Sequence, residues 1–135
     1  MQTNEAAEEA ATSTAERWLA LIDGADYAES WNQASSLLKS GVETSVLFKR
    51  GISEDQWRST TATAQTHLGK VESRTLRSRR YVEELPGEPE GEYVVMEYEA
   101  SFGSEKKNGV EKVILTKDHD GEWRVSGYKI MLGQI

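Results

Sequence analysis

The sequence has no cysteine, two prolines and two histidines among 135 residues. Without cysteine the chain can form neither a disulfide nor a thiolate metal site. No apolar run approaches the roughly 20 residues of a membrane-spanning helix, so we expect no membrane span. The formal net charge of −7 argues against a nucleic-acid partner, because phosphate groups attract a net basic surface.

The sequence also lacks common signatures of catalysis and of cofactor binding. It contains no G-x-S-x-G motif, no phosphate-binding loop and no dinucleotide fingerprint. His67 and His119 lie far apart, without flanking ligands at metal spacing. The glutamate-rich run at 83–92 lacks the pattern of a calcium loop, and we expect it to be a solvated connector. We therefore predict no metal, no cofactor and no assigned catalytic residue.

The length of 135 residues fits one domain with a buried core. We expect a flexible segment at 1–12 and a single domain at 13–135. The first residues, MQTNEAAEEAATST, have neither the basic nor the apolar region of a signal peptide. This leaves both the cytoplasm and an exported location open.

The first half of the sequence predicts three helices. Capping patterns at 13–16, 26–29 and 53–56 precede apolar residues spaced by three and four. We expect helices over about 13–23, 26–51 and 53–68. Val42, Val46 and Leu47 keep the period of the second helix, and Gly41 either ends this helix or lies within it.

The second half changes to a period of two, which is typical of strands. In EYVVMEYEASF (92–102) alternate apolar residues share one face. Asn108-Gly109 and Asp120-Gly121 are pairs preferred in two-residue hairpin turns. The predicted strands are 70–82, 92–104, 109–118 and 122–132. We therefore expect an α+β domain in which three N-terminal helices pack on a curved four-stranded antiparallel sheet and can leave a cone-shaped cavity.

Four arginines lie within 74–81, directly before a stretch rich in glutamate. If the first two strands pair so that residue numbers sum to about 174, Arg77 lies opposite Glu97, and Arg79 also faces solvent. The same register places these residues on the apolar face: Arg74, Leu76, Ser78 and Arg80. An unpaired charge there is costly, so Arg74 is either paired with an acidic side chain from the helices or lines a pocket for an anionic group.

A few polar groups in an apolar pocket are the usual make-up of a small-ligand site. Our candidate ligand-binding residues are Arg74, Tyr98, Tyr128, Trp31 and Trp57. Core packing is the alternative for the aromatic residues. The candidates for acid–base chemistry are Asp26, Tyr27, His67, Tyr98 and Tyr128. Asp26 is better explained as a helix cap.

Five stretches occur in an order that matches a known family: AERWLALIDGADYAESW (15–31), ISEDQW (52–57), LGKVESRTLRS (68–78), LPGEPEGEYVVMEYEASF (85–102) and GEWRVSGYKI (121–130). In these stretches the chain resembles the bacterial proteins grouped as domain of unknown function 4019, within the nuclear transport factor 2-like (cystatin-like) superfamily. The resemblance implies a cone-shaped α+β fold, an exported, periplasmic location and no established activity. The segment between Trp31 and Ile52 is longer than the family pattern, which predicts an extended or broken second helix.

We expect a non-enzymatic domain that binds a small ligand in the cone cavity or a protein partner through the sheet. A homodimer through the outer face is expected from Tyr93, Val95, Val113 and Leu115, which would supply apolar area there. The alternative is a small enzyme of the isomerase or dehydratase kind that uses a tyrosine or aspartate in the cavity. A cavity of at least ~300 Å³ with a titratable pair in hydrogen-bond reach would favour the enzyme.

Overall fold

The computed structural model describes residues 4–43, 48–103 and 107–132. Helices and one short hairpin form the first half, and long strands form the second. In chain order the elements are α1 (Asn4–Asp23), α2 (Tyr27–Asn32), α3 (Ser36–Ser40), β1 (Gly41–Glu43), β2 (Phe48–Arg50), α4 (Glu54–Leu68), β3 (Val71–Val82), β4 (Tyr93–Phe102), β5 (Lys107–Lys117) and β6 (Trp123–Leu132). This confirms the α+β class, with the helices before an open antiparallel sheet.

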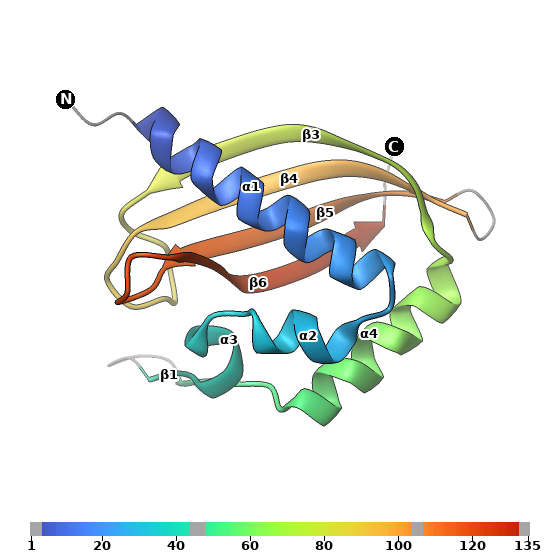
Figure 1. Cartoon of the computed structure of the whole chain (residues 1–135), viewed down its shortest axis with the longest axis horizontal. Coiled ribbons are helices and arrows are strands. Elements are labelled where there is room, and N and C mark those ends of the chain that lie inside the picture. Colours follow the sequence, from blue (N-terminus) through green and yellow to red (C-terminus); the bar gives the residue numbers. More distant parts are fainter. Residues whose placement is uncertain (1–3, 44–47, 104–106, 133–135) are drawn as a thin grey trace.

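The long strands form one antiparallel sheet in the order β3-β4-β5-β6, so the predicted meander is confirmed. Helix α1 lies diagonally across one face of this curved sheet and contacts all four strands (Figure 1). We call the face that α1 covers the inner face. The main core contains Ala11, Ala15, Trp18, Leu19, Ile22, Trp57, Val94, Met96, Tyr98, Val113, Leu115, Trp123 and Val125. Among the described residues, no helix is long and apolar enough to cross a membrane.

Helix α1 begins at Asn4, well before the capping pattern at Ser13, so that predicted boundary is wrong. The extra turns are rich in alanine, the residue with the highest helix propensity. Ala11 and Ala15 are fully buried, so tertiary packing also holds this part of the helix. Most of the segment that we expected to be flexible is therefore helical.

The second predicted helix, over 26–51, is broken into α2 and α3 and is followed by the hairpin of β1 and β2. The break lies at Ser35, whose backbone N–H donates to the Val125 carbonyl oxygen at 2.7 Å. The Ser35 hydroxyl donates to Asp118 at 2.8 Å, and both bonds hold the chain against the end of the sheet. The apolar residues with helical spacing fall in β1 (Val42) or outside the described residues (Val46 and Leu47).

The third capping box is confirmed at the start of α4. The Gln56 backbone N–H donates to the Ser53 hydroxyl at 3.2 Å, and the Ser53 backbone N–H donates to the Gln56 side chain at 3.1 Å. The helix ends before Gly69, whose φ of 79° favours glycine. The Gln65 side chain donates to the Ile22 carbonyl oxygen at 2.7 Å, so the C-terminal ends of α4 and α1 lie together.

The predicted hairpin turn at Asn108-Gly109 is wrong, because both residues lie within β5 and pair with β4. Glycine is needed there for close packing: a Cβ on Gly109 would lie 2.9 Å from the Met131 carbonyl oxygen. The chain does turn at Asp120-Gly121, where Gly121 has a φ of 85°. The Asn-Gly pair suggested a turn, but its glycine is in fact required for the close packing of β5 against β6.

After a first register shift between Val71 and Ser73, strands β3 and β4 keep the predicted register from Ser73 to Leu76, which lies opposite Tyr98. A bulge then leaves Arg77 as an extra residue of β3, and every later pair shifts by one. Ser78, rather than Arg77, therefore lies opposite Glu97. The predicted pairing of Arg77 with Glu97 is wrong for this reason.

The same bulge exchanges the faces of two arginines. Arg79, predicted to face solvent, lies opposite Met96 on the inner face. Its guanidinium donates to the Thr12 hydroxyl at 3.1 Å and lies 3.9 Å from the Glu8 carboxylate. Arg80, predicted to face inward, is exposed on the outer face. The arginine-rich strand thus uses its inward guanidinium groups to hold α1.

The outer face of the sheet is less apolar than expected. Val113 and Leu115 pair with inner-face residues of β4 and are fully buried, so their predicted outer position is wrong. Tyr93 does lie on the outer face but is 1% exposed, because its hydroxyl donates to the Pro89 carbonyl oxygen of the connector at 2.6 Å. Of the four residues that motivated the homodimer, Val95 alone remains partly exposed on that face.

Candidate functional site

Two cavities lie at opposite ends of the inner face. The wide cavity, of about 790 Å³, is lined by the first half of α1, the end of β3 and the turn between β5 and β6. The narrow cavity, of about 240 Å³, is lined by the C-terminal ends of α1 and α4 and by the opposite end of the sheet. Only the second includes residues that the sequence analysis proposed for ligand binding.

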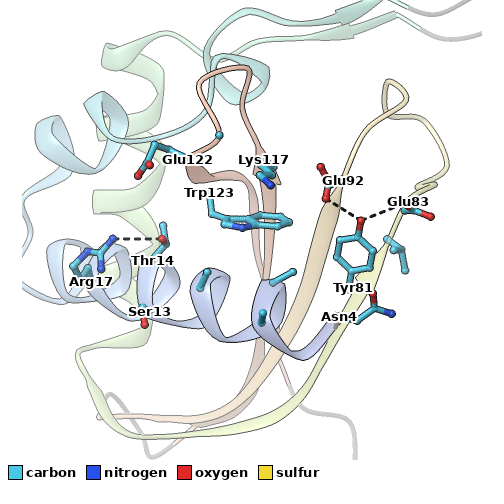
Figure 2. A pocket seen from close by; sticks show the side chains of 15 residues that line it. Asn4, Ser13, Thr14, Arg17, Tyr81, Glu83, Glu92, Lys117, Glu122 and Trp123 are labelled. Atoms are coloured by element: carbon cyan, nitrogen blue, oxygen red, sulfur yellow. Dashed lines mark hydrogen bonds between the residues drawn. The ribbon is translucent and has the colours of Figure 1, made fainter. Parts of the chain in front are cut away.

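The wide cavity has a polar rim (Figure 2). The indole of Trp123 lies near its centre, with Tyr81, Glu83 and Glu92 to one side. The Tyr81 hydroxyl lies 2.9 Å from the Glu92 carboxylate and 3.3 Å from the Glu83 carboxylate. Burial, and then the hydrogen bond and charge of Glu92, raises the pKa of Tyr81. These polar side chains leave a small ligand little apolar surface to cover.

The surface of the narrow cavity is mainly apolar, with a smaller polar part. Its lining comprises Ile22, Asp23, Trp57, Thr60, Thr61, Ala64, Gln65, Leu68, Gly69, Val71, Phe102, Glu111, Tyr128, Lys129 and Ile130. This is the composition usual for a small-molecule site. We therefore take the narrow cavity as the candidate site.

A bulge in β6 places Tyr128 in this cavity. Val125 lies opposite Leu115 and Tyr128 opposite Val113, so both share the inner face although they are three residues apart. Regular alternation would put them on opposite faces, and the register shift at Ser126 removes that difference. The site therefore depends on an irregularity of the strand.

Three residues of this lining, Asp23, Glu111 and Tyr128, are joined by hydrogen bonds to Arg74 or to one another. We call these three residues and Arg74 the ionic cluster, and the part of the wall that they form the polar end. The Glu111 side chain is 1% exposed and accepts hydrogen bonds from Arg74 Nε at 2.6 Å and from the Tyr128 hydroxyl at 2.5 Å. Arg74 Nη1 and Nη2 each donate to one oxygen of Asp23 at 2.9 Å. One guanidinium therefore binds two carboxylates at once, in the forked geometry that arginine favours.

The electrostatics of the cluster fix its protonation at neutral pH. Burial opposes the charge of Arg74, but hydrogen bonds to Asp23 and Glu111 and their negative charges prevail and raise the pKa of Arg74 above its usual value. Burial, and then the charge of Glu111, raises the pKa of Tyr128. Arg74 thus stays a cation and Tyr128 a neutral donor. Of the two alternatives for Arg74, the structure shows pairing with acidic side chains. One of these side chains, Asp23, comes from helix α1.

Two of the five proposed ligand-binding residues, Trp57 and Tyr128, line the narrow cavity. They pack around Trp18, with ring centroids 5.6 Å and 5.3 Å from its own. The indole N–H of Trp57 donates to the Ser30 hydroxyl at 2.9 Å. Both rings therefore serve the core and the cavity wall together.

The other three proposed residues do not line the cavity. Arg74 is absent from the lining and is bound to Asp23 and Glu111, which belong to it. Tyr98 is 2% exposed, its hydroxyl finds no hydrogen-bond partner among the described residues, and burial raises its pKa to about 12. Trp31 lies elsewhere: its indole N–H donates to the Ile52 carbonyl oxygen at 3.0 Å.

The remaining acid–base candidates, Asp26, Tyr27 and His67, do not line the narrow cavity. Asp26 caps α2, as predicted, and accepts from the Glu29 backbone N–H at 3.4 Å. The Tyr27 hydroxyl bonds to the Gln65 side chain, and His67 is exposed at the end of α4. Within residues 4–43, 48–103 and 107–132, no three His, Asp or Glu side chains are grouped to hold a metal ion.

The sequence analysis missed Asp23 and Glu111, although each leaves a signal. A carboxylate is unfavourable at a helix C-terminus, so Asp23 at the end of α1 needs a cation nearby. Glu111 belongs to the same alternation as Val113 and Leu115, so an acidic residue stands in an apolar row. Both signals point to a buried basic partner, which Arg74 provides.

Residues 14–128 match the family model described as "Protein of unknown function (DUF4019)". The chain belongs to this family. No curated protein matches the chain. The DUF4019 match runs from within α1 to Tyr128, so it includes the whole ionic cluster.

Proposed function

We propose that this DUF4019 protein is a non-enzymatic binding domain whose narrow cavity holds one small, largely apolar molecule. The observation that supports this proposal most is the cavity itself. It has a volume of about 240 Å³, mainly apolar walls, and a polar end that includes the buried Glu111. The arrangement of α1 over a curved sheet also supports a place in the nuclear transport factor 2-like superfamily. A protein partner on the outer face is the weaker form of the proposal, because the connector covers Tyr93.

The rival reading as an isomerase or dehydratase has less support. In the narrow cavity Tyr128 and Glu111 form a titratable pair in hydrogen-bond reach, but the volume is below the roughly 300 Å³ that we set for an enzyme. The wide cavity meets both conditions through Tyr81 and Glu92, but its surface is mainly polar and the pKa of Tyr81 is raised, chiefly by burial. A general acid or base works best with a pKa near the working pH. Tyr128 has a raised pKa, and Arg74 already holds both carboxylates.

The test uses 2-phenylethanol as a neutral probe of suitable size, with calorimetric titration. We expect a Kd between about 0.1 and 5 mM, since so small a ligand gains a limited free energy. Ala64→Phe places a ring in the cavity and should weaken binding by about tenfold or more. Thr63→Phe is the matched control, because Thr63 is exposed on the same helix and does not line the cavity.

The proposal fails if Ala64→Phe binds 2-phenylethanol as well as Thr63→Phe does, or if the wild-type protein binds neither 2-phenylethanol nor the charged phenyl ligands described below. Far-ultraviolet circular dichroism of both variants checks that each is folded before the binding data are compared.

A further inference from the structure

The charges of the ionic cluster do not cancel. Asp23 and Glu111 contribute two negative charges and Arg74 one positive charge, so the cluster carries a net charge of −1. Lys129 also lines the cavity, but it is exposed and lies opposite Lys112 on the outer face of the sheet. An exposed ammonium group is screened by water, so it offsets the charge of the cluster only weakly.

Two helix dipoles add to this negative potential. Helix α1 ends at Asp23 and helix α4 ends at Leu68, and both residues line the narrow cavity. The C-terminus of a helix behaves as roughly half a negative charge. The negative ends of two helices therefore converge where the cluster already has an excess of carboxylate.

The two carboxylates differ in how a ligand can reach them. Glu111 is 1% exposed and is held by Arg74 and Tyr128, whereas the Asp23 side chain is 39% exposed. Each oxygen of Asp23 accepts one hydrogen bond from Arg74, and a carboxylate oxygen can accept more than one. Asp23 is thus the accessible acceptor at the polar end.

We propose that the ligand of the narrow cavity carries a cationic group, such as an ammonium, that pairs with Asp23 while its apolar part lies against Trp57 and Ile130. This inference rests on the proposed function, because it names the ligand class of the same cavity. It also excludes the anionic ligand that an arginine-lined pocket would have favoured, since Arg74 is already shared by two carboxylates.

The test compares three ligands with the same phenyl group: 2-phenylethylamine, which is an ammonium at neutral pH, neutral 2-phenylethanol, and the anion phenylacetate. Calorimetric titration of the wild-type protein should give a Kd for the amine about tenfold lower than for the alcohol, and the weakest binding for phenylacetate. The advantage of the amine should shrink at high salt, because screening weakens a partly exposed ion pair.

Two variants locate the effect. Asp23→Asn should reduce the advantage of the amine over the alcohol to about twofold or less. The readout is the ratio of the two Kd values, in which a change in binding that is common to both ligands cancels. Glu9→Gln removes the same charge from an exposed position on α1 and should leave the advantage unchanged. If Asp23→Asn does not fold, the ligand series and its salt dependence on the wild-type protein decide the question.

The outcomes separate the two proposals. If the alcohol or phenylacetate binds at least as tightly as the amine, the proposal of a cationic ligand is wrong. The proposal that the cavity binds a small molecule is then still supported. If none of the three ligands binds, the proposed function fails, and this inference fails with it.

Discussion

The two ends of the inner face use similar side chains with different results. At the narrow cavity, Tyr128 donates to Glu111, which is 1% exposed and bound by Arg74. At the wide cavity, Tyr81 bonds to Glu83 and Glu92 near the rim, where water competes for the same groups. Burial determines how much such a hydrogen bond contributes to the free energy of unfolding. An interaction removed from water is stronger, and losing it costs more. We therefore expect both stability and binding to depend far more on the narrow end.

The largest effect is expected from Arg74→Gln. The change leaves Glu111 buried without its cation and should lower the free energy of unfolding by about 3–5 kcal/mol. Urea unfolding measures the loss. The matched control is Arg77→Gln in the exposed bulge of β3, which should change stability by less than about 0.5 kcal/mol. Equal effects of the two variants would contradict the assigned role of the cluster.

Two tyrosine variants should have opposite signs. Tyr128→Phe removes a donor to a buried carboxylate and should cost about 1.5–3 kcal/mol. Tyr98→Phe removes a buried hydroxyl that has no partner among the described residues, and should stabilise the protein by about 1 kcal/mol. Thermal and urea unfolding of both variants give the comparison. A loss of more than about 1 kcal/mol on Tyr98→Phe would show that its hydroxyl is bonded in solution.

Stability should fall at high pH because of the same buried tyrosines. Burial raises the pKa of Tyr98 to about 12, while an unfolded tyrosine ionises near pH 10. Below about pH 10 the hydroxyl is neutral in both states and the full stability is present; between about 10 and 12 the unfolded state loses its proton first, so unfolding is favoured. The free energy of unfolding of wild type and of Tyr98→Phe should be measured at rising pH. In this range the variant should become more stable relative to the wild type by up to about 1.4 kcal/mol per pH unit. A constant difference between them would contradict the assigned burial.

The smallest effect is expected from Tyr81→Phe at the wide cavity. Its hydroxyl bonds near the rim, so the loss should be about 0.5 kcal/mol or less. The comparison between the two ends fails if Tyr81→Phe costs as much as Tyr128→Phe in the same urea experiment.

Much of the fold follows from local sequence signals, and the exceptions have physical causes. The capping box at Ser53 and the alternation of β4 predicted α4 and the meander because they depend on neighbouring residues alone. The bulge at Arg77 has no such local signal, yet it exchanged Arg79 and Arg80 between the faces. A register can be derived from a pattern only as far as the first irregular residue.

The candidate site was partly predictable for the same reason. Trp57 belongs to an apolar row that the sequence displays, whereas Tyr128 reaches the inner face only through the bulge at Ser126. The cluster joins Asp23, Arg74 and Glu111 from three distant segments, and only the folded topology brings them together. Its charge balance, and with it the preference for a cation, could not be derived before the partners were known.

The central claim is that a ligand enters the narrow end and not the wide end, and one nuclear magnetic resonance titration tests it most directly. Each tryptophan has a single indole N–H signal; Trp57 lines the narrow cavity and Trp123 the wide one. Titration with 2-phenylethylamine should shift the Trp57 indole signal with saturation and leave the Trp123 signal in place, with assignments made by Trp→Phe variants. A saturable shift of Trp123 with Trp57 unmoved would contradict the account.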